Sequence, residues 1–281
     1  MNSLPAYLCD KADDQLFLWR YQVEAAERFG VTLAHVEETA LERNILPARY
    51  QRNLQTISVQ DQLTLFRSTV AVVGCGGRGG YVIEELARMG VGRLVVIDPD
   101  VFEEHNLNRQ LLSTPATLGM PKVEAAVRRV GDINPAVTVV PQQCAFSAAN
   151  GAELLDSCRL AVDALDNITV RLELAQTCSD LDIALVHGAI AGWYGHVTTL
   201  LPGDTTLEEL YASPLRRETG IEQHLGNPSF TPAVVASLQA AEVCKLLLGL
   251  GEPLRGRTLM IDLLSMEFHE ISGNNNTVSP S

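Results

Sequence analysis

A glycine-rich loop offers the clearest chemistry in the sequence. Gly74, Gly76 and Gly79 form the pattern G-x-G-x-x-G directly after a short apolar, β-branched run. Such glycines allow a tight turn and a close backbone approach, and the N-terminus of the following helix attracts anionic phosphate. Asp98 ends the next apolar run, where a carboxylate can accept hydrogen bonds from ribose hydroxyls. The pattern predicts a nucleotide site but leaves NAD, FAD and ATP open.

Charged side chains around and after Asp98 favour ATP among these three. The loop reads GCGGRGG, which is richer in glycine than a dinucleotide fold requires. Arg109 and Lys122 follow, and cations near a phosphate loop can offset the charge that develops on a transferring phosphate. Bound NAD makes no such demand. Arg109 belongs to a dense polar cluster that comprises Asp100, Glu103, Glu104, His105, Asn106, Asn108, Arg109 and Gln110.

Short apolar strands that alternate with helices must position these residues. This alternation predicts an α/β fold with a Rossmann-like, doubly wound and mostly parallel sheet, and with helices on both faces. After Gly188 we expect antiparallel strands toward the C-terminus, together with a long helix that has Pro232 in its first turn. The predicted strands are 69–73, 93–97, 137–140, 160–163, 184–186, 195–201, 258–262 and 267–271. One predicted helix follows the glycine loop and ends at Met89, and another is capped by Ser147. The remaining predicted helices of the domain are 122–130, 169–180 and 232–248.

Three parts are expected along the chain. Residues 1–45 are predicted to form an N-terminal helical extension of two helices, the second capped by Thr32. Residues 46–271 are predicted to form the ATP-binding domain, and residues 272–281 a disordered tail. The first helix of the extension is indicated by apolar residues at helical spacing, which are Leu16, Trp19, Val23, Ala26 and Phe29.

Composition and charge exclude several classes of protein. Of the 281 residues 46% are hydrophobic, which excludes disorder over most of the length. The net charge of −13 argues against a nucleic-acid binder, so no DNA partner is expected. No apolar run approaches the roughly 18–20 residues of a membrane span, so no membrane partner is expected, and the N-terminus lacks signal-peptide features. Six cysteines without paired spacing indicate reduced thiols, so we expect a cytoplasmic protein.

Several strings occur along the chain in the order of a known family. They are RYQRN at 49–53, GCGGRGGYVIEELARMGVG, VIDPDVFEEHNLNRQ, GMPKVEAA, INP, DALDN and SLQAAEVCKLLLG at 237–249. Together they resemble the MoeB/ThiF/HesA group of ubiquitin-like-protein activating enzymes over about residues 49–270. Members of that group use ATP and Mg²⁺ to adenylate the terminal glycine carboxylate of a small partner protein, and they release pyrophosphate.

The resemblance implies a role for each matching residue. Asp166 would bind or orient Mg²⁺, which favours carboxylate and phosphate oxygens. Arg52 would reach into the partner subunit's site across a two-fold interface, as an arginine finger. The loop of Gly74, Gly76, Gly77 and Gly79 would cradle phosphate, Asp98 would hold the ribose, and Asn106, Arg109 and Lys122 would contact the phosphates. The implied assembly is a homodimer, and the implied partner is a small ubiquitin-like or sulfur-carrier protein that ends in Gly-Gly.

The sequence departs from the family pattern at three points. It has no C-x-x-C pair, so no zinc site of four sulfur ligands is expected. It has no cysteine between Cys178 and Cys244, where thioester- or persulfide-forming relatives carry their nucleophile, so we expect the chemistry to stop at the adenylate. Arg78 occupies a loop position that is usually apolar in the family, where a cation could touch phosphate or point to solvent.

Three rival functions stay open at this point. The first is activation of a carboxylate on a modified tRNA base, against which the acidic net charge counts. The second is a nucleotide-binding regulatory protein without turnover, which the presence of Arg109, Lys122 and Asp166 disfavours. The third is an NAD oxidoreductase, which the same cluster and the lack of a clear hydride-transfer acid disfavour.

Overall fold

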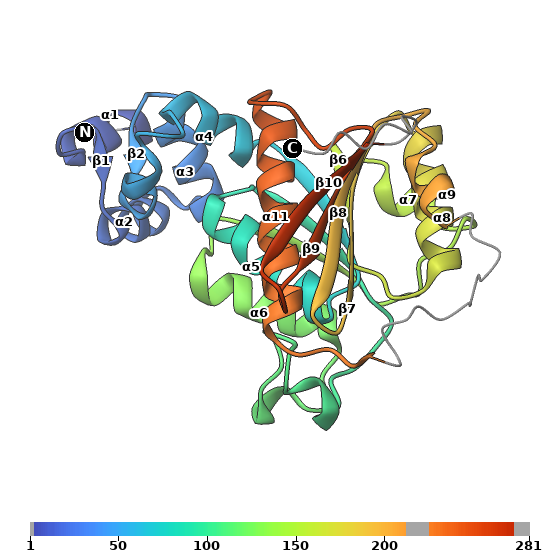
Figure 1. Ribbon diagram of the computed structural model, residues 1–281. Helices are drawn as coiled ribbons and strands as arrows, with labels where there is room; N and C mark the ends of the chain where they lie inside the picture. Colours follow the sequence, from blue (N-terminus) through green and yellow to red (C-terminus); the bar gives the residue numbers. More distant parts are fainter. Residues whose placement is uncertain (1–2, 212–224, 273–281) are drawn as a thin grey trace.

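The computed structural model describes residues 3–211 and 225–272, and these form an α/β fold around one eight-stranded sheet (Figure 1). The strand order is β10-β9-β8-β7-β6-β3-β4-β5, and β3 to β7 are parallel while β8, β9 and β10 are antiparallel to their neighbours. The predicted fold class is therefore confirmed. The strands are β3 (Thr69–Val73), β4 (Arg93–Ile97), β5 (Thr138–Gln142), β6 (Leu160–Asp163), β7 (Ala184–Ala191), β8 (Tyr194–Leu200), β9 (Arg257–Asp262) and β10 (Glu267–Ser272).

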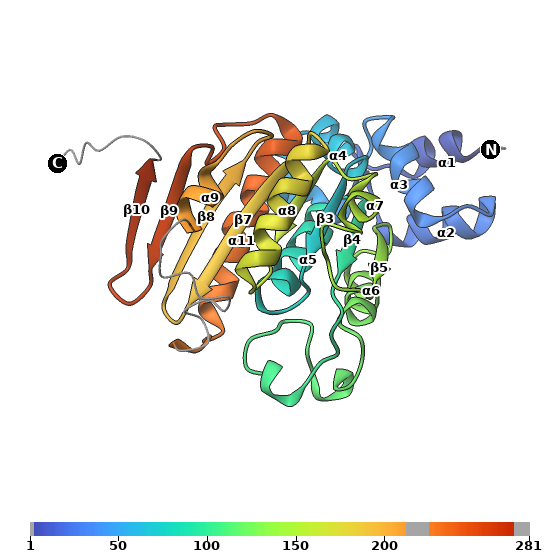
Figure 2. The ribbon, with the colours of Figure 1, turned by 90° about the vertical axis from the view of Figure 1, so that its right-hand side faces the viewer.

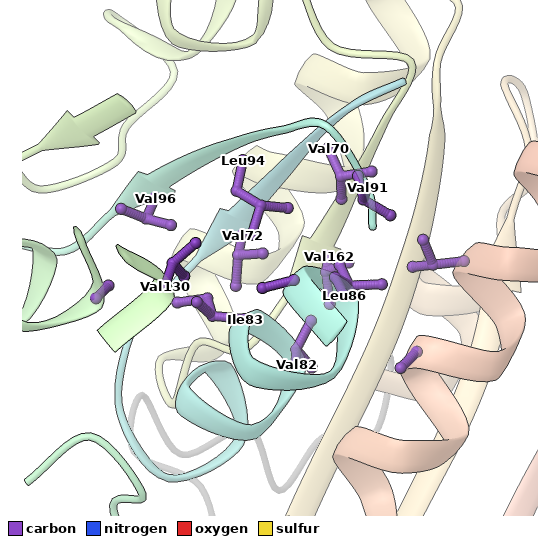
Figure 3. Packing of buried hydrophobic residues seen from close by; sticks show 14 of the residues in the cluster. Val70, Val72, Val82, Ile83, Leu86, Val91, Leu94, Val96, Val130 and Val162 are labelled. Carbon is purple, nitrogen blue, oxygen red and sulfur yellow. The ribbon is translucent and has the colours of Figure 1, made fainter. Parts of the chain in front are cut away.

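Helices cover both faces of this sheet, as Figures 1 and 2 show. Successive residues of a strand point to opposite faces, so Val70 and Val72 join one core cluster while Ala71 and Val73 join another. Figure 3 shows the first cluster between the strands and helix α5. Helices α5 (Gly77–Met89), α6 (Lys122–Ile133) and α11 (Phe230–Leu248) cover the first face, and α7 (Gly151–Leu155), α8 (Ile168–Asp180) and α9 (Thr206–Tyr211) cover the second.

Two details of the domain correct the sequence-based expectations. Strand β7 runs on through Gly188 to Ala191, and this position suits glycine because a Cβ there would lie 2.7 Å from the Gln239 side chain of α11. Ser147 does not cap a helix: α7 begins four residues later, and the Asn150 side chain accepts a hydrogen bond from the Ser147 amide at 2.9 Å. The predicted tail lies outside the described residues from residue 273 onward.

Helix α11 is the longest described helix and belongs to the core. Among the described residues it is the one helix that is long and apolar enough to cross a membrane, by length and composition alone. Half of that stretch is buried inside the molecule, where Val235, Ala236 and Val243 pack against the sheet and α5. This burial is what a core helix of an α/β domain requires.

The N-terminal extension contains three helices rather than two. They are α1 (Leu4–Lys11), α2 (Trp19–Phe29) and α3 (Leu33–Leu41), and the predicted cap at Thr32 accepts the His35 amide at 3.1 Å. Helix α1 was missed because eight residues show too little periodicity to be distinguished. Leu16 belongs to no helix but to β1 (Leu16–Phe17), which pairs with β2 (Leu46–Pro47) through a long-range contact.

A buried polar network fixes the extension to the end of the domain that lies away from the glycine loop. Tyr50 donates a hydrogen bond to Glu37 at 2.7 Å and accepts one from Asn134 at 2.8 Å. Asn134 ends α6 and also donates to the Ala87 carbonyl near the end of α5 at 2.9 Å. Arg49 pairs with Glu37 at 3.0 Å. Figures 1 and 2 show the extension at the opposite end of the sheet from the loop after β4.

Candidate active site

The glycine loop joins β3 to α5, and its glycines have two different tasks. Gly74 has a φ of 97°, and a Cβ there would lie 2.8 Å from the Ala164 carbonyl oxygen. A Cβ on Gly79 would overlap the carbonyl oxygen of Gly74. Gly76 and Gly77, by contrast, stand at the start of α5, where an added Cβ would lie 3.5 Å from the nearest atom, an ordinary van der Waals distance. Gly74 and Gly79 thus bring helix and strands together, while Gly76 and Gly77 turn the helix N-terminus outward.

A cavity of about 580 Å³ lies in front of this helix N-terminus. It is enclosed by the glycine loop, the loop after β4 and the loop after β6, at the carboxyl ends of adjacent parallel strands. The chain leaves β3 toward β4 on one side and returns to β6 on the other, which is the switch point where α/β sheets bind ligands. The predicted site residues that line the cavity are Gly74, Gly76, Gly77, Asp98, Arg109, Lys122 and Asp166.

Three predicted site residues do not line this cavity. Gly79 faces inward against Gly74, as described above. Asn106 is 4% exposed, and its side chain accepts a hydrogen bond from the Glu103 amide at 2.9 Å, which holds the loop after β4. Arg52 is exposed on the short helix η1 (Ala48–Asn53), at the far end of the sheet.

Two buried charges face the cavity between β4 and α6. The Asp98 carboxylate accepts hydrogen bonds from the amides of Cys75 at 2.7 Å and Asp100 at 2.9 Å. The Lys122 ammonium lies 2.9 Å from the Asp100 carboxylate and 4.0 Å from that of Asp98. Burial raises the pKa of Asp98, and Lys122 opposes that shift. Burial also raises the pKa of the Cys75 thiol well above its usual value, which suits a packing role.

Arg109 and Asp166 face the same cavity from its two rims. Arg109 donates hydrogen bonds to the His105 carbonyl at 3.0 Å and to the Asn108 side chain at 2.9 Å, so its guanidinium is held near the rim. Asp166 is exposed at the start of α8, in the loop after β6. Within the described residues no group of three or more His, Cys, Asp or Glu could hold a metal. The absence of a zinc site stays a prediction.

The structure adds two cavity residues to which the sequence assigned no role. Gln110 is 7% exposed, and its buried side-chain oxygen has no hydrogen-bond partner in the described part of the chain. The Asn227 side-chain oxygen is likewise buried without such a partner, and the Asn227 backbone carbonyl accepts from Asn108 at 3.1 Å. A buried polar atom without a partner is costly, so both oxygens suit a ligand that donates hydrogen bonds.

Arg78 does not point to solvent: it lines the cavity, and its guanidinium is directed to the segment after β6. It is 4% exposed and donates hydrogen bonds to the backbone carbonyls of Asp163, at 3.4 Å, and Leu165. The Asp163 carbonyl ends β6, and the Leu165 carbonyl belongs to the loop that carries Asp166. The sequence could not reveal this contact, because 87 residues separate Arg78 from Leu165.

A buried network of ionisable groups lies behind the Asp166 loop. Asp163 is fully buried and lies 2.6 Å from Nδ1 of His187, whose Nε2 lies 3.1 Å from Nε2 of His196. Burial would raise the pKa of Asp163, but His187 and Arg171 lower it below its usual value. Burial lowers the pKa of His187, although Asp163 opposes the shift. Burial and His187 hold the pKa of His196 well below its usual value.

Comparison with known proteins gives one family and several close relatives. Residues 50–280 match the ThiF family. The chain is 37% identical to the SAMP-activating enzyme E1 of Haloferax volcanii, over 83% of this chain and 87% of that protein. It is 35% identical to the sulfur carrier protein adenylyltransferase of Thermus thermophilus, over 83% and 89%, and 34% identical to the molybdopterin-synthase adenylyltransferase of Escherichia coli, over 79% and 91%.

Solved structures share the fold at lower identity. The crystal structure of E. coli MccB aligns with a TM-score of 0.70 and 21% identity, over 83% of this chain and 74% of that chain. The structure of PaaA aligns with a TM-score of 0.68 and 23% identity, over 80% and 72%. These two likenesses concern the arrangement of helices and strands.

Proposed function

The chain belongs to the ThiF family, and we propose that it uses ATP to adenylate the C-terminal carboxylate of a small ubiquitin-like or sulfur-carrier protein. It is an adenylyltransferase of the MoeB/ThiF type, as its relatives at 32–37% identity over most of the chain show. The proposed substrate is supported by the relatives' names, which refer to SAMP activation, a sulfur carrier protein and molybdopterin synthase. The observation that carries it is the convergence of Arg109, Lys122 and Asp166 around a helix N-terminus at one cavity.

The residues of the cavity fit ATP. The N-terminus of α5, beginning at Gly76 and Gly77, presents backbone N–H groups to phosphate oxygens. Asp98 accepts two backbone amides, yet a carboxylate has about four acceptor positions, so it can also accept ribose hydroxyls. The unpartnered oxygens of Gln110 and Asn227 can accept further donors from the nucleotide or the incoming peptide.

In the proposed reaction a carboxylate oxygen of the carrier attacks the α-phosphorus of ATP. The bond from that phosphorus to the oxygen bridging the α- and β-phosphates breaks, and pyrophosphate leaves with the electron pair. Lys122 and Arg109 offset the negative charge that builds on the phosphates, and their fixed partners keep them in place before the substrates arrive. The carboxylate is already ionised at neutral pH, so the step needs no general base.

The donor set also fits Mg²⁺ held together with ATP. Mg²⁺ is usually bound through one or two carboxylates and the substrate phosphates, and it keeps several waters. Asp166 offers one exposed carboxylate on the cavity wall, and the phosphate oxygens would supply further ligands. When bound, the ion would neutralise phosphate charge and orient the triphosphate.

We propose a homodimer in which Arg52 serves the neighbouring subunit's site. Tyr50, two residues before Arg52, lies against Gly90 at the end of α5, while Gly77 at the start of α5 lines the cavity. The 13 residues of that helix span roughly 20 Å, so Arg52 cannot reach the cavity of its own chain. A two-fold interface would present two such arginines at once.

We further propose that the reaction ends at the acyl-adenylate in the cytoplasm. All six cysteines are free, as in a reducing compartment. The segment in which relatives carry a nucleophilic cysteine has none here, although its residues 212–224 lie outside the described part. Cys144 lines the cavity, so Cys144→Ser is the control for any thiol step.

The test is exchange of pyrophosphate into ATP, measured with candidate small proteins that end in Gly-Gly. Exchange should depend on the carrier and on its free C-terminal carboxylate, and it should persist in Cys144→Ser. The same carrier with an amidated C-terminus is the matched control. Equal exchange with the amidated carrier would contradict the proposal.

A further inference from the structure

The loops that bear the two halves of the cavity are joined by Arg78. Its backbone belongs to the first turn of α5, within the glycine loop that faces the phosphates. Its guanidinium crosses to the other side and donates to the carbonyls of Asp163 and Leu165. The Leu165 carbonyl immediately precedes Asp166. Arg78 is thus a direct side-chain connection between the phosphate loop and the segment that presents the proposed Mg²⁺ carboxylate.

Other contacts fix the same segment from its own side. The Leu165 amide donates to the Asp163 side chain at 2.9 Å, and Arg171 donates to the Leu165 carbonyl at 2.9 Å. Arg171 lies only six residues from Leu165, so it stabilises the start of α8 locally. Arg78 is different because it arrives from a separate loop, and its planar fork can serve both carbonyls at once. A carbonyl oxygen has two lone pairs, so Leu165 can accept from both arginines.

We infer that Arg78 is a positioning residue that aligns Asp166 with the phosphates held at the N-terminus of α5. This inference rests on the proposed function, because it takes Asp166 to act on Mg²⁺ bound with ATP. The Arg78 side chain is buried on the cavity wall, and its two terminal nitrogens donate to backbone carbonyls on either side of Ala164, so it acts on Asp166 through this segment. Outer partners of a metal ligand matter in this way, and their loss typically costs about 10- to 100-fold in metal affinity or activity.

The experiment measures how much Mg²⁺ is needed to stabilise the ATP-bound protein against heat, with ATP held constant. Arg78→Met keeps an unbranched apolar stem and removes the donors, and it should raise the half-saturating Mg²⁺ concentration by about 10-fold or more. Arg78→Lys should give a smaller rise, because its ammonium still donates hydrogen bonds, but from a single nitrogen rather than from a planar fork. Arg88→Met, on the exposed side of the same helix, is the matched control and should behave as wild type.

A double-mutant cycle separates positioning from a general structural role. In an Asp166→Asn background, Arg78→Met should add little further change in the Mg²⁺ requirement, because both variants damage one function. Additive effects, or an unchanged requirement in the single variant, would overturn the inference. If Arg78→Met does not unfold cooperatively, the same comparison with Arg78→Lys decides. The readout uses ATP and Mg²⁺ without any carrier. A failure to find carrier-dependent exchange would therefore contradict the proposed function and leave the test of Arg78 unaffected.

Discussion

Gly79 packs against the carbonyl oxygen of Gly74 so closely that any Cβ on Gly79 would overlap that oxygen. This contact brings the first turn of α5 onto the end of β3 and thereby sets where the helix N-terminus points. Gly79, the third glycine of the G-x-G-x-x-G pattern, therefore supports the site from behind, while Gly76 and Gly77 face the cavity.

We expect Gly79→Ala to destabilise the fold by about 1–3 kcal/mol, the cost typical of an overpacked interior. Gly131→Ala is the matched control, because it lies in helix α6 with no atom within 4 Å of its added Cβ. That substitution should instead add up to about 1 kcal/mol of stability, since alanine favours a helix. Urea unfolding measures both, and a Gly79→Ala protein as stable as wild type would contradict the packing role.

Lys122→Ala and Arg109→Ala should each lower adenylation by about 100-fold, the scale for losing one positioned electrostatic contact. Lys122→Ala also leaves Asp98 and Asp100 without their cation, so its thermal stability has to be measured alongside activity. Lys11→Ala, a partly exposed lysine in the extension, is the control. Wild-type activity in a folded Lys122→Ala protein would remove Lys122 from the reaction.

Acidification should destabilise the protein between about pH 7 and pH 5 through its buried imidazoles. The pKa values of His187 and His196 are lowered in the folded protein, so the unfolded chain binds more protons as the pH falls through about 6.5. The contribution of the two histidines to the free energy of unfolding is therefore present above that pH and lost as the pH falls below it. His196→Gln should flatten the fall in melting temperature from pH 7.5 to 5.5. His269→Gln, at an exposed site, should leave it unchanged, and an equal slope in all three proteins would count against the buried network.

Arg52→Ala and Lys122→Ala should complement each other if the sites are completed in trans. Each variant should be nearly inactive alone. After subunit exchange, roughly half the dimers are mixed and each has one intact site, so activity should return to roughly a quarter of wild type. No recovery despite proven exchange, or a monomer in solution, would refute the arrangement.

The sequence predicted the parallel part of the fold within a few residues because apolar strands and amphipathic helices alternate clearly there. Helix α1 and the second half of β7 were missed. In the sequence alone Gly188 indicates the end of a strand, and only its close approach to Gln239 shows why a strand carries glycine there. The N-terminal anchor of Tyr50 and Asn134 was also out of reach, because it joins segments 84 residues apart.

Some residues of the candidate site could likewise be predicted from the sequence, and others could not. Motif order sufficed for Asp98, Lys122 and Asp166. The first two follow β4 and the third follows β6, and these two strands lie on either side of β3, so the three residues meet at the carboxyl ends of parallel strands. The other residues in and behind the cavity are brought together by long-range contacts that the sequence does not reveal. His187 and His196 meet because the β7–β8 register sets Ala189 opposite His196, and Asn227 enters the cavity from a connection far along the chain.

The central claim is that this cavity joins AMP to a carboxylate at the end of a small protein. Intact-mass analysis of a candidate Gly-Gly carrier, quenched after incubation with the enzyme, ATP and Mg²⁺, tests it most directly. We expect a mass gain equal to one adenylyl group on the free carrier, none on the amidated carrier, and almost none with Lys122→Ala. A carrier that binds yet gains no mass, or a dithiothreitol-sensitive adduct on a cysteine of the enzyme in place of the adenylate, would contradict the account.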